Sequence, residues 1–253
     1  MKKKILLSLL AVAAIAVGVV GMAAFEAHVI NVTAKIENAL SVDTASIDFG
    51  TVFPQEELDE SFDIALSDSF MAEDRVDSVD YIIRQKPKCG WTEDDGTILL
   101  GLPTMSGEID DTGAITCPDH GDPSPPPDAV WGALPSLCEY ISKHEQTEDG
   151  QETDNDGSLD AFHQTGAIEN NVWVWNDVFG RLAKIAGDSS DTWELDLKVP
   201  CFGGNCAQDW ADFVTEINSS ANPDDYTQPI ENEHKIYGCD LWVEVTGVDR
   251  LQS

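Results

Sequence analysis

The sequence predicts a mainly β protein, an antiparallel β-sandwich with long loops and one or two short helices. Several segments alternate apolar and polar residues, as half-buried strands require. Only two short stretches have the 3.6-residue period of a helix. Sandwiches commonly run to about 200–250 residues, so we expect one domain over residues 38–253, with loop insertions at about 103–165 and 201–234.

Alternation places the strands. We expect them at residues 28–36, 39–42, 46–49, 58–66, 79–85, 97–102, 171–175, 193–199 and 236–248. In the first, one face carries Ile30, Val32, Ala34 and Ile36. In the last, one face carries Cys239, Leu241, Val243 and Val245, and the other carries Asp240, Trp242, Glu244 and Thr246. The two helical stretches are residues 210–217, after a possible Asn205 cap, and residues 135–144; both suit packing on a sheet.

The N-terminus predicts a secretory signal peptide over residues 1–24. Three lysines at positions 2–4 precede a nearly unbroken apolar run, which ends at the small residues Gly21, Ala23 and Ala24. The alternative is an uncleaved anchor, because residues 5–25 are long enough to span a bilayer. In both cases the remaining chain lies outside, so we expect a secreted, extracellular or cell-surface protein with no membrane contact once the signal is cleaved.

Acidic residues dominate the charge. Removing residues 1–24 takes away three lysines and no acidic residue, so 11 basic residues face 47 acidic ones and the formal charge is −36. Such a surface repels nucleic acid and anionic lipid, and it attracts divalent cations. The same charge also suits solubility or life at high salt.

The six cysteines form an even set in a chain that we expect to be exported, which favours three disulfides. Spacing alone singles out Cys201 with Cys206, because the glycines between them allow a small closed loop. A zinc site is the competing interpretation. It lacks a Cys-x-x-Cys pair and a nearby pair of histidines.

An acidic loop is the sharpest local motif. Acidic residues occupy every second position up to Gly157, and the carboxylate oxygens of such an arrangement can bind one calcium ion. The candidate ligands are Glu152, Asp154, Asp156, Ser158 through its carbonyl, and Asp160. The loop departs from an EF-hand, since His163 stands where the bidentate glutamate belongs, and it fits the shorter calcium loops of extracellular repeats better. The alternative is a solvated acidic loop.

No catalytic motif is present, and we expect no enzyme. There is no His-Glu-x-x-His, no Gly-x-Ser-x-Gly and no phosphate-binding glycine loop. A pair of carboxylates for glycoside hydrolysis is left open, although nothing identifies one. Trp173 and Trp175 share a strand face and could stack on a sugar, but packing is the commoner use. Asn31 and Asn218 begin glycosylation sequons.

Three regions together resemble the TasA and camelysin family of exported biofilm-fibre proteins. The signal ends in Gly21-Met-Ala-Ala-Phe25, similar to the exit of that family. Residues 39–53 and 58–66, joined by a turn containing Pro54, resemble its early strands. Residues 236–248 resemble its long closing strand. The six cysteines, the proline-rich loop at residues 121–128 and the acidic loop depart from the family.

The resemblance implies a jelly-roll sandwich whose N-terminal segment, residues 25–37, lies as a donor strand in a groove of the next copy, giving a homopolymer. The alternative is an ordinary first strand. Because the resemblance places their strands close together, we expect Cys89 to pair with Cys239, and Cys117 with Cys138 across the proline-rich loop. Camelysin relatives have been classed as metalloproteases, but this chain has no zinc motif.

The function that we expect from these features is a structural subunit of an extracellular fibre or matrix. The runner-up is a monomeric, calcium-dependent surface-binding module, and a secreted hydrolase is third.

Overall fold

The computed structural model describes residues 35–44, 46–93, 102–120, 127–146 and 158–250. The chain divides into two units, Met1–Ile36 and Glu37–Ser253, and the fold reported below is that of the second. The predicted signal peptide, residues 1–24, lies outside the described residues. Among the described residues, no helix is both long enough and apolar enough to cross a bilayer.

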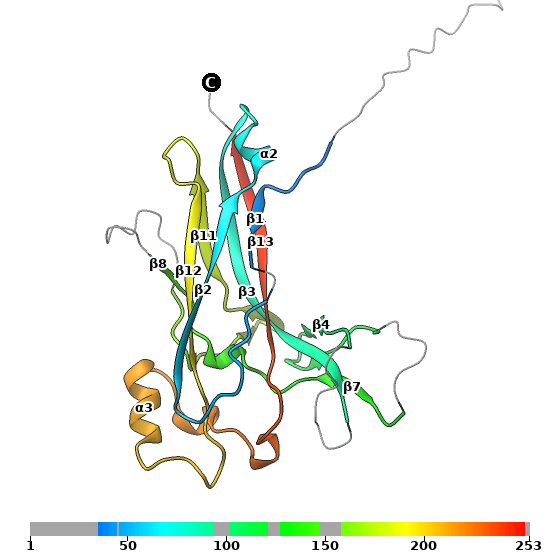
Figure 1. Cartoon of the computed structure of the whole chain (residues 1–253), viewed down its shortest axis with the longest axis vertical. Helices are drawn as coiled ribbons and strands as arrows, with labels where there is room; N and C mark the ends of the chain where they lie inside the picture. Colours follow the sequence, from blue (N-terminus) through cyan, green and yellow to red (C-terminus); the bar gives the residue numbers. More distant parts are fainter. Residues whose placement is uncertain (1–34, 45, 94–101, 121–126, 147–157, 251–253) are drawn as a thin grey trace, which may run out of the picture. The chain divides into compact units, whose positions relative to one another are not determined.

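The first sheet has the strand order β1-β2-β12-β8, all antiparallel (Figure 1). Its bounds are Leu40–Val42 for β1, Glu57–Leu66 for β2, Ser190–Lys198 for β12 and His144–Gln146 for β8. Phe62, Ile64 and Leu66 alternate on the buried face of β2. Trp193, Leu195 and Leu197 do the same on β12, so the period of two fixes which face is covered.

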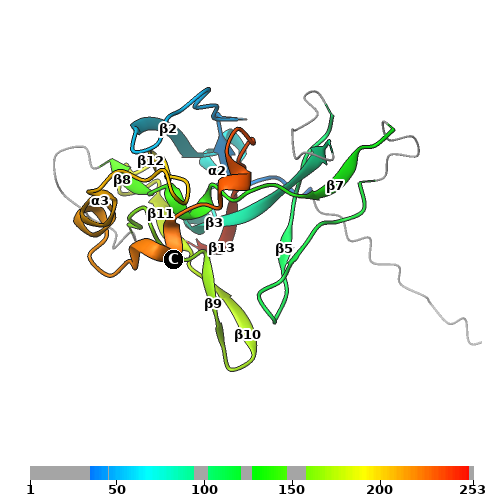
Figure 2. The same cartoon turned by 90° about the horizontal axis from the view of Figure 1, so that it is seen from below.

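The second sheet is built on β3, Val76–Thr92, which lies between β11, Val178–Ala183, and β13, Cys239–Arg250. Beyond these partners β3 continues and pairs with β4, Met105–Ser106, and β7, Val130–Ala133. Two hairpins complete the strands: β5, Glu108–Ile109, with β6, Ile115–Thr116, and β9, Gly166–Glu169, with β10, Val172–Trp175. Figure 2 shows β5 and the β9–β10 hairpin projecting on the same side.

The core lies between these two sheets, as the mainly β prediction requires. It includes Tyr81, Ile83, Ile64, Trp193 and Leu195. The Tyr81 hydroxyl accepts a hydrogen bond from Trp193 Nε1 at 2.8 Å and donates one to the Asp191 carboxylate. The buried polar groups of this part of the core are therefore paired.

The helices are short and pack around the sandwich. Helix α2, Asp68–Met71, is capped by the Ser67 hydroxyl. Helix α3, Trp210–Ile217, buries Trp210 and Val214 against the core, and its N-cap is Asp209 rather than the predicted Asn205. The described part of the chain also has the 3-10 turns η1, Cys138–Tyr140, η3, Pro223–Tyr226, and η4, Ile230–Asn232.

Most predicted strands are confirmed, with shifted ends, at residues 39–42, 58–66, 79–85, 171–175, 193–199 and 236–248. The strand prediction at residues 46–49 is wrong: the segment forms no strand. The helix prediction at residues 135–144 is also wrong, since only η1 forms before β8 begins. Residues 28–34 and 97–101 lie outside the described residues.

The two predicted loop insertions contain regular structure. The region at 103–165 carries β4 to β8, and the region at 201–234 carries α3, η3 and η4.

Of the predicted disulfides, Cys201–Cys206 is confirmed and the other two pairings are wrong. The structure joins Cys89 to Cys117 and Cys138 to Cys239. Cys239 lies opposite Pro87, because β3 runs on past the start of β13 and carries Cys89 two residues further into the sheet with β4 and β7. Cys138 instead lies in η1, directly beside the start of β13: the Leu137 amide donates to the Gly238 carbonyl.

Candidate functional site

Each sheet has a strand with one free edge, and the two edges lie on the same side of the sandwich (Figure 1). Among the described strands, β1 pairs only with β2, and β13 pairs only with β3. A free edge presents unpaired backbone N–H and C=O groups that can bind another strand.

Core-facing side chains on these edge strands remain exposed. Val42 lies opposite the buried Ile64 and is 41% exposed. On β13, Val245 lies opposite the buried Tyr81 and is 41% exposed, and Val248 lies opposite Val79 and is 45% exposed. Paired residues share a face of the sheet, so these valines point toward the core yet meet solvent. The sandwich is therefore open along this side.

An extended segment, residues 46–52, follows the open side without joining a sheet. Ile47, Phe49 and Val52 pack against the core. No backbone–backbone hydrogen bond joins residues 46–52 to another described residue. The segment is fixed at its end, where the Phe53 amide donates to the Glu56 carboxylate at 2.9 Å and the Gln55 amide to the Val199 carbonyl at 3.0 Å. It thus has side-chain packing but no backbone pairing.

A groove runs between this segment and β13. Its first part is a cavity of about 380 Å³ bounded by Val42, Ile47 and Phe49 on one side and by Leu241 and Val243 on the other. Its floor is formed by Phe62, Leu137, Ile141 and Leu195. A second cavity of about 510 Å³ adjoins it and is lined by Val52, Phe53, Val199, Phe202, Ile236 and Tyr237. We call the two together the edge groove.

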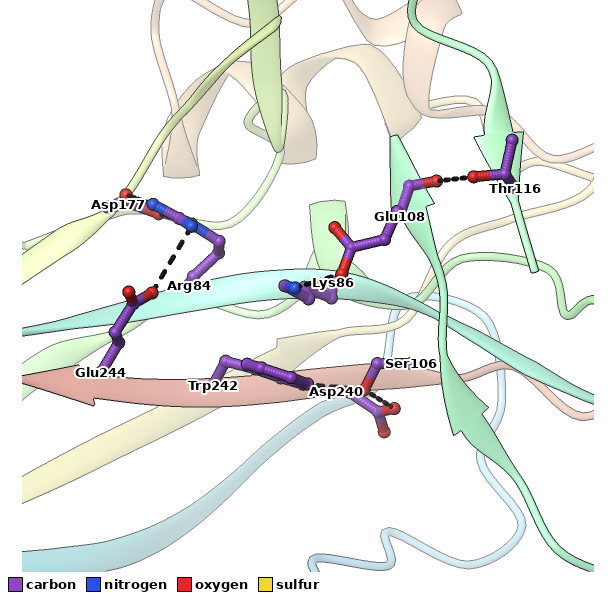
Figure 3. Close-up of polar contacts among 9 residues, drawn as sticks. All are labelled: Arg84, Lys86, Ser106, Glu108, Thr116, Asp177, Asp240, Trp242 and Glu244. Atoms are coloured by element: carbon purple, nitrogen blue, oxygen red, sulfur yellow. Dashed lines mark hydrogen bonds and ion pairs between the residues drawn. The ribbon is translucent and has the colours of Figure 1, made fainter. Parts of the chain in front are cut away.

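Charged and aromatic contacts hold β13 against β3 on the outer face of the sheet (Figure 3). Lys86 Nζ lies 2.6 Å from the Glu108 carboxylate and 3.9 Å from the centre of the Trp242 ring. Trp242 Nε1 donates to Ser106 Oγ at 2.7 Å, and Ser106 Oγ donates to Asp240 at 2.7 Å. Ser106, Asp240 and Trp242 also line the first cavity, so this network forms part of the wall on the β13 side of the groove.

Two more cations extend this outer network along β3. Arg84 binds both carboxylate oxygens of Asp177, at 2.9 and 2.6 Å, and lies 3.6 Å from Glu244. The hydrogen bond to Asp177 raises the pKa of Arg84, against the effect of burial. Lys88 Nζ donates to Asp240 at 2.8 Å. Such a charged network fixes the position of two strands relative to each other, because a bidentate pair requires one specific geometry.

The predicted donor residues lie mostly outside this description. Ile30, Val32 and Ala34 are outside the described residues. Ile36 is described, has no strand partner among the described residues, and its side chain is 94% exposed. The donor role of the segment stays a prediction.

The structure describes two of the predicted calcium ligands. Glu152, Asp154 and Asp156 are outside the described residues, whereas Ser158 and Asp160 are inside. The Asp160 carboxylate lies 3.8 Å from His144 Nε2, and its carbonyl accepts a hydrogen bond from His163 Nδ1 at 2.8 Å. Among the described residues, no group of three or more potential metal ligands comes together. Calcium binding stays a prediction.

The paired tryptophans contact protein groups. Their ring centres are 5.9 Å apart, edge to face. Trp173 packs beside Gly113 of the β5–β6 hairpin, where a Cβ would lie 3.6 Å from the ring, and Trp175 lies 5.4 Å from the Arg84 guanidinium. Both rings therefore join the β9–β10 hairpin to its neighbours.

The sequon at Asn218 is tied into the fold, whereas Asn31 lies outside the described residues. Asn218 Nδ2 donates to the Phe162 carbonyl at 3.0 Å, and its Oδ1 accepts hydrogen bonds from Ser220. The amide nitrogen that would carry a glycan is therefore engaged in the folded protein.

A buried polar cluster behind the groove floor was not foreseen from the sequence. Gln85 Nε2 donates to the carbonyl of Ile141, whose side chain lines the groove, and Gln85 Oε1 lies 2.6 Å from His163 Nε2. Burial lowers the pKa of His163 to about 3 and that of Lys143 to about 7. The only sequence signal is that Lys143 follows Ile141 at strand spacing, on the face that turns inward.

Comparison with protein-family models, with curated proteins and with solved structures finds no match for this chain.

Proposed function

We propose that this protein is a structural subunit of an extracellular fibre or surface matrix, in which residues 25–37 of one copy add as a strand in the edge groove of the next. The observation that carries the proposal is the edge groove itself: a groove with an apolar floor beside the free edge of β13. Strand addition uses such an edge for backbone hydrogen bonds and the adjoining pockets for alternate side chains.

Length and pattern suit this occupant. Eight consecutive residues, 236–243, line the first cavity, which corresponds to about 26 Å of strand at about 3.3 Å per residue. Residues 30–36 span about 23 Å by the same measure. Their alternating Ile30, Val32, Ala34 and Ile36 would face the apolar floor. Full burial of each isoleucine or valine side chain stabilises the complex by roughly 1.5–3 kcal/mol.

The two halves of β13 differ in a way that favours pairing beside the groove. Register shifts interrupt β13 between Val245 and Gly247 and between Asp249 and Arg250. Bulges blunt an edge against pairing. Residues 239–245 keep regular register with β3, and those up to Val243 line the groove. The pairing surface is therefore confined to the half of β13 that has the edge groove beside it.

The direction of the chain favours an open polymer over a closed dimer. Leu40, which follows the N-terminal segment, pairs with Leu66 at one end of β2. The groove runs from Val42, opposite Ile64 near that end, to Phe53, just before Glu57 begins β2 at the other end. Because the donor segment and the groove are different surfaces of the chain, a donor in a neighbour's groove makes a head-to-tail contact, and such contacts propagate as filaments unless they close into a ring.

The last part of the proposal is that the protein is exported and assembles outside the cell. Three disulfides are compatible with an oxidising environment. The N-terminal sequence has the layout of a secretory signal, and the resemblance to the TasA and camelysin family points to the same role. We therefore place assembly outside the cell.

Negative-stain electron microscopy of the exported chain, with and without residues 25–36, tests the proposal. We expect fibres from the full chain and folded monomers from the shortened chain. Fibres that persist after the deletion would contradict strand donation. Unfolding of the shortened chain would show instead that the segment is an intrinsic strand of its own sandwich.

A further inference from the structure

One covalent bond joins the floor of the edge groove to its wall. Cys239 is the first residue of β13 and lines the groove. Its disulfide partner, Cys138, lies in the η1 turn between Leu137 and Ile141, two residues of the floor. The bond closes a loop with a sequence separation of 101, so it connects two distant parts of the chain at the groove.

The same junction is otherwise held by little backbone pairing. The Leu137 amide donates to the Gly238 carbonyl at 3.0 Å, and the Gly238 amide donates to the Pro135 carbonyl at 3.0 Å. The contact is also close: a Cβ on Gly238 would lie 2.8 Å from Lys88 Cβ and 3.2 Å from Leu134 Cδ1. These two hydrogen bonds and the disulfide therefore hold the start of the wall to the η1 turn.

We propose that the Cys138–Cys239 disulfide is the positioning bond of the edge groove, and that the chain accepts a donor strand only after this bond has formed. The inference rests on the proposed function. A groove whose wall is held in its bound geometry binds without the entropic cost of ordering the wall. With two free thiols, residues 236–238, which precede the ladder between β13 and β3, can separate from the η1 turn, and the width of the groove at this point is no longer fixed.

The chemistry is a thiol–disulfide exchange. Cys138 and Cys239 together lose two protons and two electrons as their S–S bond forms. The electrons go to an oxidant of the disulfide class, which is reduced to its dithiol. Such oxidants act outside the cytoplasm, so the same step that completes the groove would confine assembly to the extracellular side.

The other disulfides give a matched comparison. Cys89–Cys117 is also buried at one end, but neither of its cysteines lines the groove. Its removal should leave the groove unchanged.

The test compares fibre formation by three full-length exported proteins at a temperature where all are folded: the parent, Cys138→Ser with Cys239→Ser, and Cys89→Ser with Cys117→Ser. Near-ultraviolet circular dichroism checks tertiary packing in each.

We expect fibres from the parent and from the Cys89 and Cys117 variant, and loss of fibres with retained near-ultraviolet signal in the Cys138 and Cys239 variant. Fibres from that variant at the level of the parent would overturn the inference and leave strand donation standing. Loss of its near-ultraviolet signal would also overturn it, because the bond would then hold the whole sandwich. An oxidised parent without fibres would refute the proposed function itself.

Discussion

Lys143 places a side-chain amine inside the sandwich, where its Nζ has no hydrogen-bond partner among the described residues. Burial disfavours the charged amine, and this lowers its pKa from 10.5 to about 7 against a small opposing effect of Asp177. Unfolding returns the amine to water and to its ordinary pKa. Between about pH 7 and 10.5 the unfolded chain therefore binds more protons than the folded one.

Lys143 should make stability depend on pH in this window. Stability rises as pH increases from 7 to 10.5, and the full penalty of the charged amine, on the order of 5 kcal/mol, is present below pH 7. We expect Lys143→Met to be more stable than the parent at pH 6 and equally stable near pH 10.5. Urea unfolding of both proteins at several pH values measures the difference. A difference that does not change with pH would mean that Lys143 is already solvated in the folded protein.

Single residues show where sequence reasoning stops. The alternation of Phe62, Ile64 and Leu66 predicted their burial, because the period of two assigns them to one face. Lys143 follows Ile141 at the same strand spacing, yet its charge predicts a solvent-exposed side chain. Its burial depends on the packing of distant parts of the chain. The hydrogen-bond partner of Asp160 could not be predicted either: His163, three residues away, donates a hydrogen bond to the Asp160 carbonyl.

At the scale of elements, β13 has two halves with different surroundings, and a pair of substitutions separates them. Val243 lines the edge groove, whereas Val248 points to the same side beyond the bulge and outside the groove. We expect Val243→Lys to remain folded and to reduce fibre yield by at least about tenfold, because an incoming strand would bury an unpaired charge. Val248→Lys should polymerise like the parent. Equal loss in both variants would indicate a general effect on β13, not one on the groove.

The disulfides should contribute unequally to stability. In the chain-entropy account a cross-link stabilises by restricting the unfolded state, and longer loops give more. The loop of Cys138–Cys239, with a separation of 101, gives about 4.7 kcal/mol, against about 2 kcal/mol for Cys201–Cys206, with a separation of 5.

Thermal melting of the two double serine variants measures this order. Removing Cys138–Cys239 should lower the melting temperature more. The reverse order would mean that local packing around Cys201, not loop length, sets the contribution.

Elements also show why strands were easier to predict than connections. Strand period is local, so residues 58–66 and 236–248 were found. Disulfide partners depend on how far β3 runs past β13, and residue spacing contains no such information. Residues 46–49 alternate like a strand but have no backbone hydrogen-bond partner among the residues that the structure describes, which depends on the sheet edges around them.

At the scale of the whole molecule, the formal charge of −33 before signal removal makes cation binding a general expectation. We expect calcium to raise the melting temperature through Asp154, Asp156 and Asp160, and the rise to disappear in Asp154→Asn with Asp156→Asn. A specific site adds about 2.7 kcal/mol at a hundredfold excess over Kd. Melting in calcium, magnesium and sodium chloride at equal ionic strength separates a site from screening. Equal shifts in both proteins and all salts would leave the loop a solvated acidic surface.

Strand donation through the edge groove is best tested by electron cryomicroscopy of the fibre. We predict an extended segment from the neighbouring copy between β13 and residues 46–52, paired with residues 239–245 and with its apolar side chains over Phe62, Leu137 and Ile141. An edge groove that is empty in the fibre, or filled by the N-terminal segment of its own chain, would contradict the account.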